Sequence, residues 1–398
     1  MTPAHPNRLG YAITLGLLAA LGPLCIDLYL PALPSLASDL QTPTATAQLS
    51  LTAGLLGLGL GQLIFGPMSD KFGRIRPLLI SLVLLLIASV GCALAQNINQ
   101  LLLARLCEGL FGAGGAVLSR AIARDMYSGH ELTRFFALLM LVNGLAPIAA
   151  PVMGGALMAI LDWRGLFMVI ALIALLLFVL AKVKLQETLI PERRSQGSIF
   201  SAWAALGQVI KYRPFMGFCL TQGFMMSGMF AYIGASPFVL QQIYGLSPQA
   251  FSFCFAANGV GLILASQISA RLSPLWGEYR VVKGALTLAF ISSGSLLITG
   301  LSGAPLPVVL VALFFSVASN GAVGVAAASL AMQSQGHRAG SASAVMGVTM
   351  FTLGGIAVPV TGIGGTSVLT MTATIFGCYM LAITMFVLLA QKPEKAHG

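Results

Sequence analysis

Charged side chains are scarce in this sequence, and their scarcity argues against a soluble protein. Asp, Glu, Lys and Arg together make up 8% of the 398 residues, whereas 57% are hydrophobic and the mean hydropathy is +0.92. Soluble domains usually carry about 25% charged residues. The composition is instead that of a protein that crosses a membrane many times.

The sequence also lacks the patterns of metal-binding, disulfide-bonded and catalytic proteins. Its six cysteines are scattered through apolar stretches, without the spacing of a metal site or a disulfide framework. Its four histidines lie at the termini or in predicted loops. The first apolar run lacks the small-residue cleavage site of a signal peptide. We therefore predict no metal, no cofactor, no enzymatic activity and no cleaved leader.

Twelve apolar runs follow one another along the chain with short gaps between them. Each can supply the roughly 20 residues that cross a bilayer as a helix. They lie near residues 9–30, 46–66, 77–96, 100–123, 135–160, 164–182, 214–240, 247–270, 282–300, 305–330, 340–363 and 366–390. The predicted fold class is an all-α membrane protein with twelve transmembrane helices in a lipid bilayer.

The net charge of +10 is distributed as in a membrane protein and does not indicate a nucleic-acid partner. If the amino terminus is cytoplasmic and the spans alternate, nineteen of the 21 Lys and Arg residues fall in cytoplasmic loops or helix ends. Only Arg164 then falls outside, and Arg105 lies within a span. The distribution predicts that both termini are cytoplasmic.

The chain is predicted to consist of two six-helix halves. Residues 186–211 are charged and proline-containing at first and then form a predicted short amphipathic helix, so we interpret them as a cytoplasmic linker. The linker separates a half at 1–185 from a half at 212–398.

The two predicted halves carry a repeated loop sequence. Residues 69–76 (SDKFGRIR) and 273–280 (SPLWGEYR) share serine, an aromatic residue, glycine and arginine at a constant separation of 204 residues, although Pro274 replaces Asp70. Such a repeat predicts halves related by a pseudo-twofold axis along the membrane normal, with a midplane site between them.

Only two of the eleven acidic residues fall within predicted spans, Asp27 and Glu108. A carboxylate at that depth costs about 2.5–3.5 kcal/mol on insertion scales, and such residues usually have a function. Pro23 and Pro31 each remove a backbone hydrogen bond beside Asp27, which loosens the helix there.

Arg105 is expected at the depth of Asp27, and Glu108 follows it on the same helical face. Burial favours a protonated carboxyl group, whereas a nearby arginine favours the ionised form. A movement of Arg105 between the two acids would therefore bind and release a proton. The alternative is a static buried ion pair that fixes helix packing. The spacing leaves both interpretations open, above all for Glu108.

Several stretches resemble those of a known family. Residues 66–77 resemble the cytoplasmic loop signature of the major facilitator superfamily, residues 105–109 its arginine-containing element in span four, and residues 146–155 its antiporter signature in span five. Together with residues 26–34 (IDLYLPALP), 120–127 and 236–240, they make the chain similar to the Bcr/CflA drug:proton antiporters, close to the bicyclomycin-resistance type. The resemblance covers all twelve predicted spans.

The resemblance implies a major facilitator fold and a function in multidrug efflux. The chain is expected to be a monomeric, multi-pass protein of the bacterial inner membrane that exports drugs in exchange for protons by alternating access and so confers antibiotic resistance. Expected substrates are small amphipathic compounds such as bicyclomycin, chloramphenicol or sulfonamides. The alternative is a proton-coupled metabolite symporter or exporter on the same fold. A membrane enzyme or channel is disfavoured, because the loops are short and no nucleophile motif or filter is present.

The resemblance also implies a conformational latch. In the family, the aspartate matching Asp70 caps the start of span eleven, and the arginine matching Arg74 pairs with the acid matching Asp125, which holds the outward-open state. Gly66 and Gly73 belong to the same signature. The alternative is a charged loop that only sets membrane orientation.

Two further features of the resemblance concern spans four and five. The family usually has glutamine where this chain has Glu108. In span five, two prolines and two glycines predict a bent and closely packed helix, although an ordinary proline kink would look the same. These helix-bending residues are Pro147, Pro151, Gly154 and Gly155.

Polar side chains within the spans are the candidates for substrate contacts, because an unpaired amide in hydrocarbon is costly. The candidates are Tyr29, Asn143, Gln222, Tyr232, Asn258 and Asn320. The methionines and aromatic residues of span seven suit a promiscuous apolar pocket. The alternative for the amides is a hydrogen bond that bridges two helices.

Overall fold

The computed structural model describes residues 8–127, 145–194, 206–333, 335 and 339–390, and these residues form helices without any strand. The helical elements up to the linker are α1 (Arg8–Asp27), η1 (Leu30–Ala32), α2 (Leu33–Asp39), α3 (Thr44–Phe72), α4 (Ile75–Leu94), α5 (Ile98–Met126), α7 (Trp163–Lys184) and η2 (Pro191–Arg193). Those after it are α9 (Arg213–Phe238), the π-helix η3 (Val239–Ile243), α10 (Pro248–Trp276), α11 (Glu278–Ser302), α12 (Leu306–Gln333), α13 (Ala339–Val360) and α14 (Val368–Leu389).

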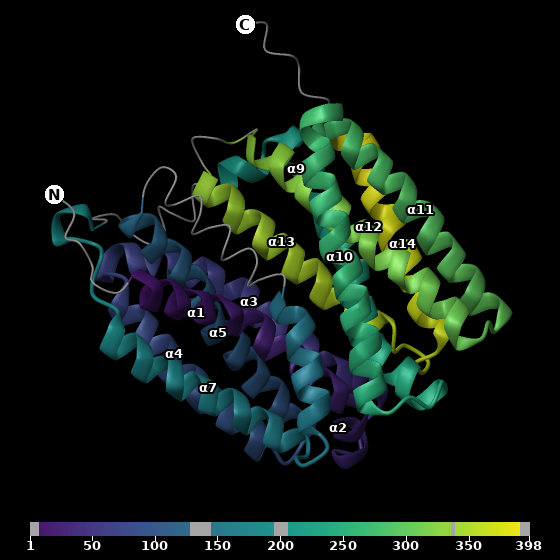
Figure 1. Cartoon of the computed structure of the whole chain (residues 1–398), viewed down its shortest axis with the longest axis horizontal. Coiled ribbons are helices and arrows are strands. Elements are labelled where there is room, and N and C mark those ends of the chain that lie inside the picture. The colour runs from purple at the N-terminus through teal and green to yellow at the C-terminus, as the bar shows by residue number, and fades with distance from the viewer. Residues whose placement is uncertain (1–7, 128–144, 195–205, 334, 336–338, 391–398) are drawn as a thin grey trace, which may run out of the picture. The chain divides into compact units, whose positions relative to one another are not determined.

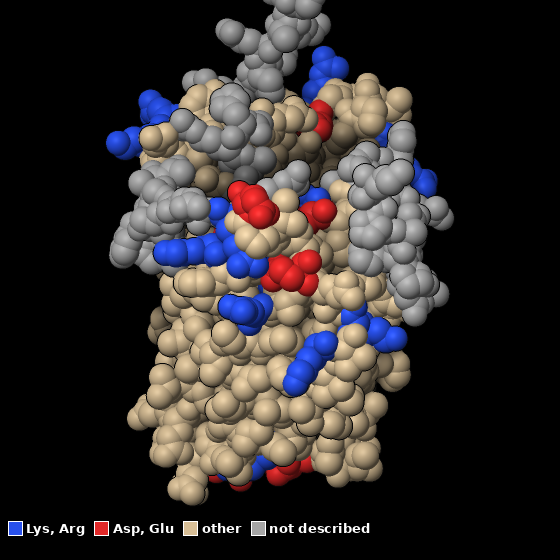
Figure 2. Space-filling model, turned by 90° about the vertical axis from the view of Figure 1, so that its left-hand side faces the viewer, with Lys and Arg blue, Asp and Glu red and all other residues tan. Residues whose placement is uncertain are grey.

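Eleven helical stretches of the described residues are long and apolar enough to cross a membrane, and a shorter apolar helix covers Leu145–Leu157. They correspond to the predicted spans, except that the span predicted at 135–160 begins outside the described residues. On the face shown in Figure 2, most charged side chains gather toward one end, and a broad uncharged surface separates them from a few at the other end. Large apolar side chains such as Leu103, which is 65% exposed, face outward as lipid contact requires.

The chain divides into two compact units. The first comprises Met1–Thr42 and Ala53–Ile199, and the second comprises Pro43–Thr52 and Phe200–Gly398. Figure 1 colours the helices of the first unit purple to teal and those of the second teal-green to yellow, except for the first turns of α3. The division after Ile199 falls within the predicted linker, of which residues 206–210 are helical. The predicted limits of the halves and of the linker stay predictions.

Among the described residues, four helices begin after a residue whose side chain accepts a hydrogen bond from a backbone N–H of the first turn. A side chain of this kind satisfies one of the donors that a helix start leaves without a partner. The four residues are Asn97 before α5, Asp162 before α7, Ser247 before α10 and Ser367 before α14. The local sequence therefore sets these helix starts.

Glycines bring α3 and α5 into backbone contact within the first unit. A Cβ atom at Gly57 would lie 2.2 Å from the carbonyl oxygen of Leu106, and one at Gly61 would lie 2.3 Å from that of Leu110. A Cβ at Gly109 would lie 2.0 Å from a carbonyl oxygen of α3. No side chain fits at these distances, so the close crossing depends on glycine. α5 also packs against α1 and α4.

The first turns of α3 satisfy backbone groups of the second unit that a proline leaves open. Pro359 in α13 has no N–H for the carbonyl group of Gly355, four residues earlier. The Thr52 hydroxyl donates to this carbonyl oxygen at 2.8 Å. Nearby, the buried Gln48 amide donates to a carbonyl oxygen of α9 at 3.1 Å and to the Thr361 hydroxyl at 3.0 Å. Such contacts let a membrane helix contain proline.

The α3–α5 crossing leads to a stability prediction. We expect Gly57→Ala to destabilise the protein by about 1–3 kcal/mol, because its methyl group would overlap the α5 backbone. Gly377→Ala in α14 is the matched control, since a Cβ there meets nothing within 4 Å. The melting temperatures of both variants are measured by thermal unfolding in detergent. Equal melting temperatures for the two variants would contradict the close crossing.

Candidate functional site

Asp27 is the last residue of α1, and the backbone leaves the α-helix directly after it. Two turn residues and the short η1 lead from there into α2. Pro31 cannot donate to the carbonyl group of Asp27, which explains why the helix ends there. Asp27 is 5% exposed, and its Oδ1 atom is buried without a hydrogen-bond partner among the described residues. This oxygen can therefore take up a proton or accept a hydrogen bond from a ligand.

Arg105 and Glu108 form a fully buried ion pair on α5. Nη1 of Arg105 binds Oε2 of Glu108 and also donates to the carbonyl oxygen of Cys25 in α1 at 2.8 Å. From α4, the Ser89 hydroxyl donates to Oε1 of Glu108 at 2.8 Å, and the Cys92 thiol donates to Oε2 at 3.7 Å. Both oxygens of Glu108 thus have donors, and the pair ties α1, α4 and α5 together.

Two aromatic rings hold the guanidinium group of Arg105 as well. Its Cζ atom lies 4.3 Å from the ring centroid of Tyr29 and 5.6 Å from that of Phe167 in α7. The two rings are themselves 5.3 Å apart. A desolvated cation–π contact stabilises by about 2 kcal/mol. The surroundings of Arg105 therefore come from α1, α4, α5 and α7, and the predicted substrate role of Tyr29 stays a prediction.

The structure brings two of the three predicted proton-coupling residues into contact. Arg105 and Glu108 are paired in the way that the static alternative described. Asp27 lies two residues after Cys25, whose carbonyl oxygen Arg105 contacts, but Asp27 and Arg105 form no ion pair among the described residues. The proton-coupling role of the three residues stays a prediction.

The polar candidates of the second unit form contacts between helices. Asn258 of α10 donates to the hydroxyl of Tyr232 in α9 at 2.8 Å, and the Tyr232 ring stacks on Phe255 at 5.5 Å. Asn320 of α12 donates to the carbonyl oxygen of Met225 in α9 at 2.6 Å. These are hydrogen bonds of the helix-bridging kind that the sequence left open. The substrate roles of the three polar residues stay predictions.

Two further substrate candidates differ from these. Oε1 of Gln222 in α9 is buried and has no hydrogen-bond partner among the described residues. Asn143 lies outside the described residues. Both stay predictions.

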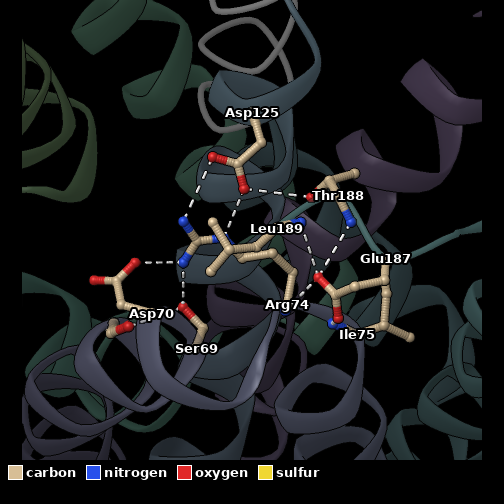
Figure 3. A network of polar contacts seen from close by, with 9 residues as sticks. Ser69, Asp70, Arg74, Ile75, Asp125, Glu187, Thr188 and Leu189 are labelled. Carbon is tan, nitrogen blue, oxygen red and sulfur yellow. Dashed lines mark hydrogen bonds and ion pairs between the residues drawn. The ribbon is translucent and has the colours of Figure 1, made fainter. Parts of the chain in front are cut away.

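Arg74 joins the loop between α3 and α4 to the end of α5 (Figure 3). Its Nε atom donates to Asp125 at 2.7 Å, and its Nη1 atom donates to Asp70 at 2.6 Å and to the Ser69 hydroxyl at 2.8 Å. Burial lowers the pKa of Arg74, but the hydrogen bonds with the two aspartates outweigh burial and raise the pKa overall. The Arg74–Asp125 ion pair is thus present, whereas its role as a latch stays a prediction.

The cap that the resemblance implies for Asp70 falls partly outside the described residues. Residues 336–338, directly before α13, are not described, and the contact of Asp70 within the first unit is the ion pair with Arg74. The capping role of Asp70 stays a prediction.

Glu187 completes this network, and the sequence pattern did not identify it. Its carboxylate accepts hydrogen bonds from the backbone N–H groups of Arg74 at 2.9 Å, Ile75 at 3.2 Å and Leu189 at 3.0 Å (Figure 3). Partial burial raises the pKa of Glu187, but these hydrogen bonds outweigh burial and lower the pKa overall. Glu187 thus caps the start of α4, where no side chain of the local sequence serves as a cap, and no pattern in the sequence links it to that helix.

A second network ties the loop between α10 and α11 to α12 in the second unit. Glu278 begins α11, and its Oε1 atom accepts a hydrogen bond from the Ser329 hydroxyl at 2.6 Å. Its Oε2 atom accepts one from the Gln333 amide at 2.7 Å. Both donors lie near the end of α12, so this contact joins a helix start to a helix end.

The two networks occupy repeated positions of the sequence. Glu278 lies 204 residues after Arg74, and Ser329 lies 204 residues after Asp125. In the first network the loop supplies the arginine and α5 supplies the acid. In the second network the loop supplies the acid, and α12 supplies an uncharged hydroxyl and an uncharged amide. The sequence repeat showed that Pro274 replaces an acid, but it did not lead us to predict a role for Glu278. The constant separation of 204 residues, which matches Glu278 with Arg74, was the signal that could have identified this role.

A glycine precedes each of these loop residues and has the same backbone conformation. The φ angle is +89° at Gly73 and +83° at Gly277, a region that favours glycine. Gly66 is different, because a Cβ there would meet nothing within 4 Å. The positive φ therefore accounts for Gly73 in the predicted signature, and the structure gives no account of Gly66.

The span-five signature lies beside Asp27. Pro147 and Pro151 both fall inside the helix Leu145–Leu157. A Cβ at Gly154 would lie 1.9 Å from the carbonyl oxygen of Leu28, so this helix contacts the backbone directly after Asp27. Gly155 is buried. The bending of the helix stays a prediction, because the residues before Leu145 are not described.

Comparison with known proteins gives a consistent result. Residues 15–359 match the sequence profile described as Major Facilitator Superfamily. The chain is 43% identical to the uncharacterized MFS-type transporter YdgK of Bacillus subtilis, with 94% of each chain covered. It is 27% identical to the bicyclomycin resistance protein homolog of Haemophilus influenzae, with 98% of each chain covered. The resemblance noted in the sequence is thereby confirmed.

A solved structure shows the same fold. A mutant of the nucleoside transporter NupG superposes with a TM-score of 0.75 at 15% identity, covering 95% of this chain and 99% of the other. At that identity the likeness concerns the fold alone. The fold class is therefore the major facilitator fold.

The Glu187 network gives a pH-dependent prediction. The pKa of Glu187 is lowered in the folded protein, so its stabilising contribution is present above the ordinary glutamate pKa of about 4.3 and is lost as the pH falls through the folded-state pKa. We expect Glu187→Gln to lower the melting temperature at pH 7, because the α4 start loses a charged cap. A helix cap stabilises by about 0.5–2 kcal/mol, and solvent screening reduces this for an exposed group.

The control for this prediction is Glu192→Gln, which changes an exposed glutamate on η2. Melting temperatures of both variants are compared with the unaltered protein between pH 7 and pH 2, a range that extends below the lowered pKa of Glu187. A Glu187→Gln deficit that stayed constant down to pH 2 would show that the charge of Glu187 is not the cause.

Proposed function

Because the chain belongs to the Major Facilitator Superfamily, we propose that it is a multidrug efflux antiporter that exports small amphipathic compounds in exchange for protons. The cell inner membrane of a bacterium is its proposed location, with both termini in the cytoplasm. Relatives named for resistance to bicyclomycin and to chloramphenicol support export of such compounds, and sulfonamides are proposed as further substrates on the sequence resemblance alone. Membrane-spanning helices and the superfamily match support a small-molecule substrate and a lipid environment.

The observation that carries the proposal is the state of Asp27. It is an acid within a membrane-spanning stretch, it is 5% exposed, and its Oδ1 atom has no hydrogen-bond partner among the described residues. An ionised carboxylate in such surroundings is unfavourable, and either a proton or a substrate group relieves this cost. Asp27 can therefore bind one or the other, which is what exchange requires.

The cycle that we propose alternates these two occupants. With the site exposed to the outside, Asp27 takes up a proton and releases the drug. With the site exposed to the cytoplasm, the proton leaves and a drug binds in its place. The proton gradient then drives the drug outward. The Arg74–Asp125 ion pair serves as the latch of one of these states, and the helix Leu145–Leu157 bends beside Asp27 during the change.

The alternative function is a proton-coupled metabolite symporter or exporter on the same fold. The named relative that is 43% identical is an uncharacterized transporter, so it does not favour one substrate class. The span-five signature, which resembles that of antiporters and packs beside Asp27, favours export.

Reconstitution in liposomes distinguishes these functions. The purified protein is inserted, a pH gradient is imposed, and the movement of radiolabelled chloramphenicol is followed. Antiport predicts accumulation against the drug gradient only when protons run in the opposite direction. Movement in the same direction as protons would overturn the antiporter proposal.

We expect Asp27→Asn to reduce proton-driven export to the background of protein-free liposomes, because an amide cannot take up a proton at these pH values. The matched control is Asp162→Asn, which changes an acid at the start of α7, where asparagine is an equally good cap. Melting temperature and size-exclusion profile verify folding. Export by Asp27→Asn at the rate of the unaltered protein would transfer the role of proton carrier to Glu108.

A further inference from the structure

The charges buried around α1 and α5 are not balanced. Arg105 and Glu108 are 0% exposed and Asp27 is 5% exposed. Arg105 carries one positive charge, and the two acids carry one negative charge each when they are ionised. One negative charge therefore remains, and it belongs to whichever carboxylate Arg105 does not neutralise.

Glu108 is the carboxylate that Arg105 neutralises. It has the arginine on Oε2, the Ser89 hydroxyl on Oε1 at 2.8 Å and the Cys92 thiol on Oε2 at 3.7 Å. The arginine is in turn held by the Cys25 carbonyl oxygen, at 2.8 Å, and by two aromatic rings. Breaking this pair would leave two buried charges without partners, which is strongly unfavourable.

Asp27 therefore carries the unbalanced charge. Its Oδ1 atom has no hydrogen-bond partner among the described residues. The other titratable groups of this cluster in the described residues are Cys25 of α1, Tyr29 in the turn after α1, and Cys92 of α4. None of them is a cation, so the one cation of this cluster that acts on Asp27 is Arg105, whose ion pair is with Glu108.

We propose that Glu108 determines the charge of the substrate: by holding Arg105, it leaves Asp27 as a single negative charge that selects monovalent organic cations in exchange for one proton. The inference rests on the proposed antiport function and names the substrate class of the same site. A proton and a monovalent cation restore the same neutral state, so the two compete on equal terms. A neutral drug leaves the negative charge uncompensated and binds less favourably.

The same charge balance predicts the effect of neutralising Glu108. In Glu108→Gln, Arg105 would balance Asp27, and the site without a ligand would already be neutral. A monovalent cation would then add an unbalanced positive charge. The substitution is therefore expected to reverse the preference from cationic toward neutral compounds.

Transport of two probes in liposomes tests this proposal. Ethidium is a monovalent organic cation and chloramphenicol is neutral, and each is followed under the same imposed pH gradient. For the unaltered protein we expect ethidium to be exported faster than chloramphenicol. We also expect ethidium export to be insensitive to an imposed membrane potential, because one positive charge moves in each direction.

The variants separate charge selection from a merely structural role. We expect Glu108→Gln to reduce the ratio of ethidium to chloramphenicol export by about tenfold or more, whereas general damage lowers both rates together. The double variant Arg105→Gln/Glu108→Gln removes both charges and leaves Asp27 negative again, so its ratio should return toward that of the unaltered protein. Glu192→Gln is the surface control.

The outcomes distinguish a failure of the antiport function from a failure of the proposed substrate class. If the unaltered protein moves neither probe against its gradient, the antiport function itself fails. If it moves chloramphenicol but not ethidium, or if ethidium export depends strongly on membrane potential, antiport stands and the substrate class is wrong. An unchanged ratio in Glu108→Gln overturns the role of Glu108. If Glu108→Gln does not fold, the double variant decides, because a lost cation preference there also overturns the proposal.

Discussion

An ionised side chain within the hydrocarbon layer requires a partner of opposite charge or a substantial compensating free energy. This constraint organises the first unit. Arg105 contacts α1 through a backbone carbonyl group, is paired on α5 with Glu108, and lies against the ring of Tyr29, just after α1, and a ring of α7. Glu108 is fixed from α4. Four helices thus depend on one ion pair, and Asp27 is the acid in this group that the pair does not satisfy. The exchange that we propose at Asp27 is based on that exclusion.

Backbone groups in a membrane follow the same constraint, since water is not present to satisfy them. Pro359 leaves a carbonyl oxygen of α13 without its helical hydrogen bond, and the Thr52 hydroxyl donates a hydrogen bond to this oxygen. In the exposed loop before α4, where water is present, the helix start also leaves N–H groups without partners in the helix, and the carboxylate of Glu187, more than a hundred residues later, accepts from them. In both cases a distant side chain completes a helix that its own sequence leaves incomplete. Glycines contribute differently, because they allow α3 and α5 to approach until backbones touch.

Much of the fold could be predicted from the sequence, because length and apolarity define a membrane helix almost by themselves. The spacing of Arg105 and Glu108 also predicted that they share a face, since residues three apart are neighbours on a helix. The sequence could not show whether Arg105 forms an ion pair with Asp27 or with Glu108. The pairing with Glu108 is supported by hydrogen bonds that Ser89 and Cys92 donate to Glu108 from another helix. It could not reveal Glu187 either, since a cap supplied from a distant segment has no local pattern. The role of Glu278 was predictable in principle from the 204-residue separation. The prediction instead considered Pro274, which replaces the acid of the first loop, and took the second loop to have lost its acid.

The reversal of charge between the two loop networks has a consequence for how each responds to its medium. Both loops pass through a glycine with positive φ and attach to the end of a neighbouring helix. In the first network the attachment joins opposite charges, one of which, on Asp70, is half exposed. Dissolved ions weaken such a contact, because screening at about 0.1 M salt acts over roughly 10 Å. In the second network the donors to Glu278 are a hydroxyl and an amide, which carry no net charge for counterions to screen. Ionic strength therefore acts unequally on two connections of similar geometry, and of the two loops it is the first whose structural contact changes in strength with the salt content of its surroundings.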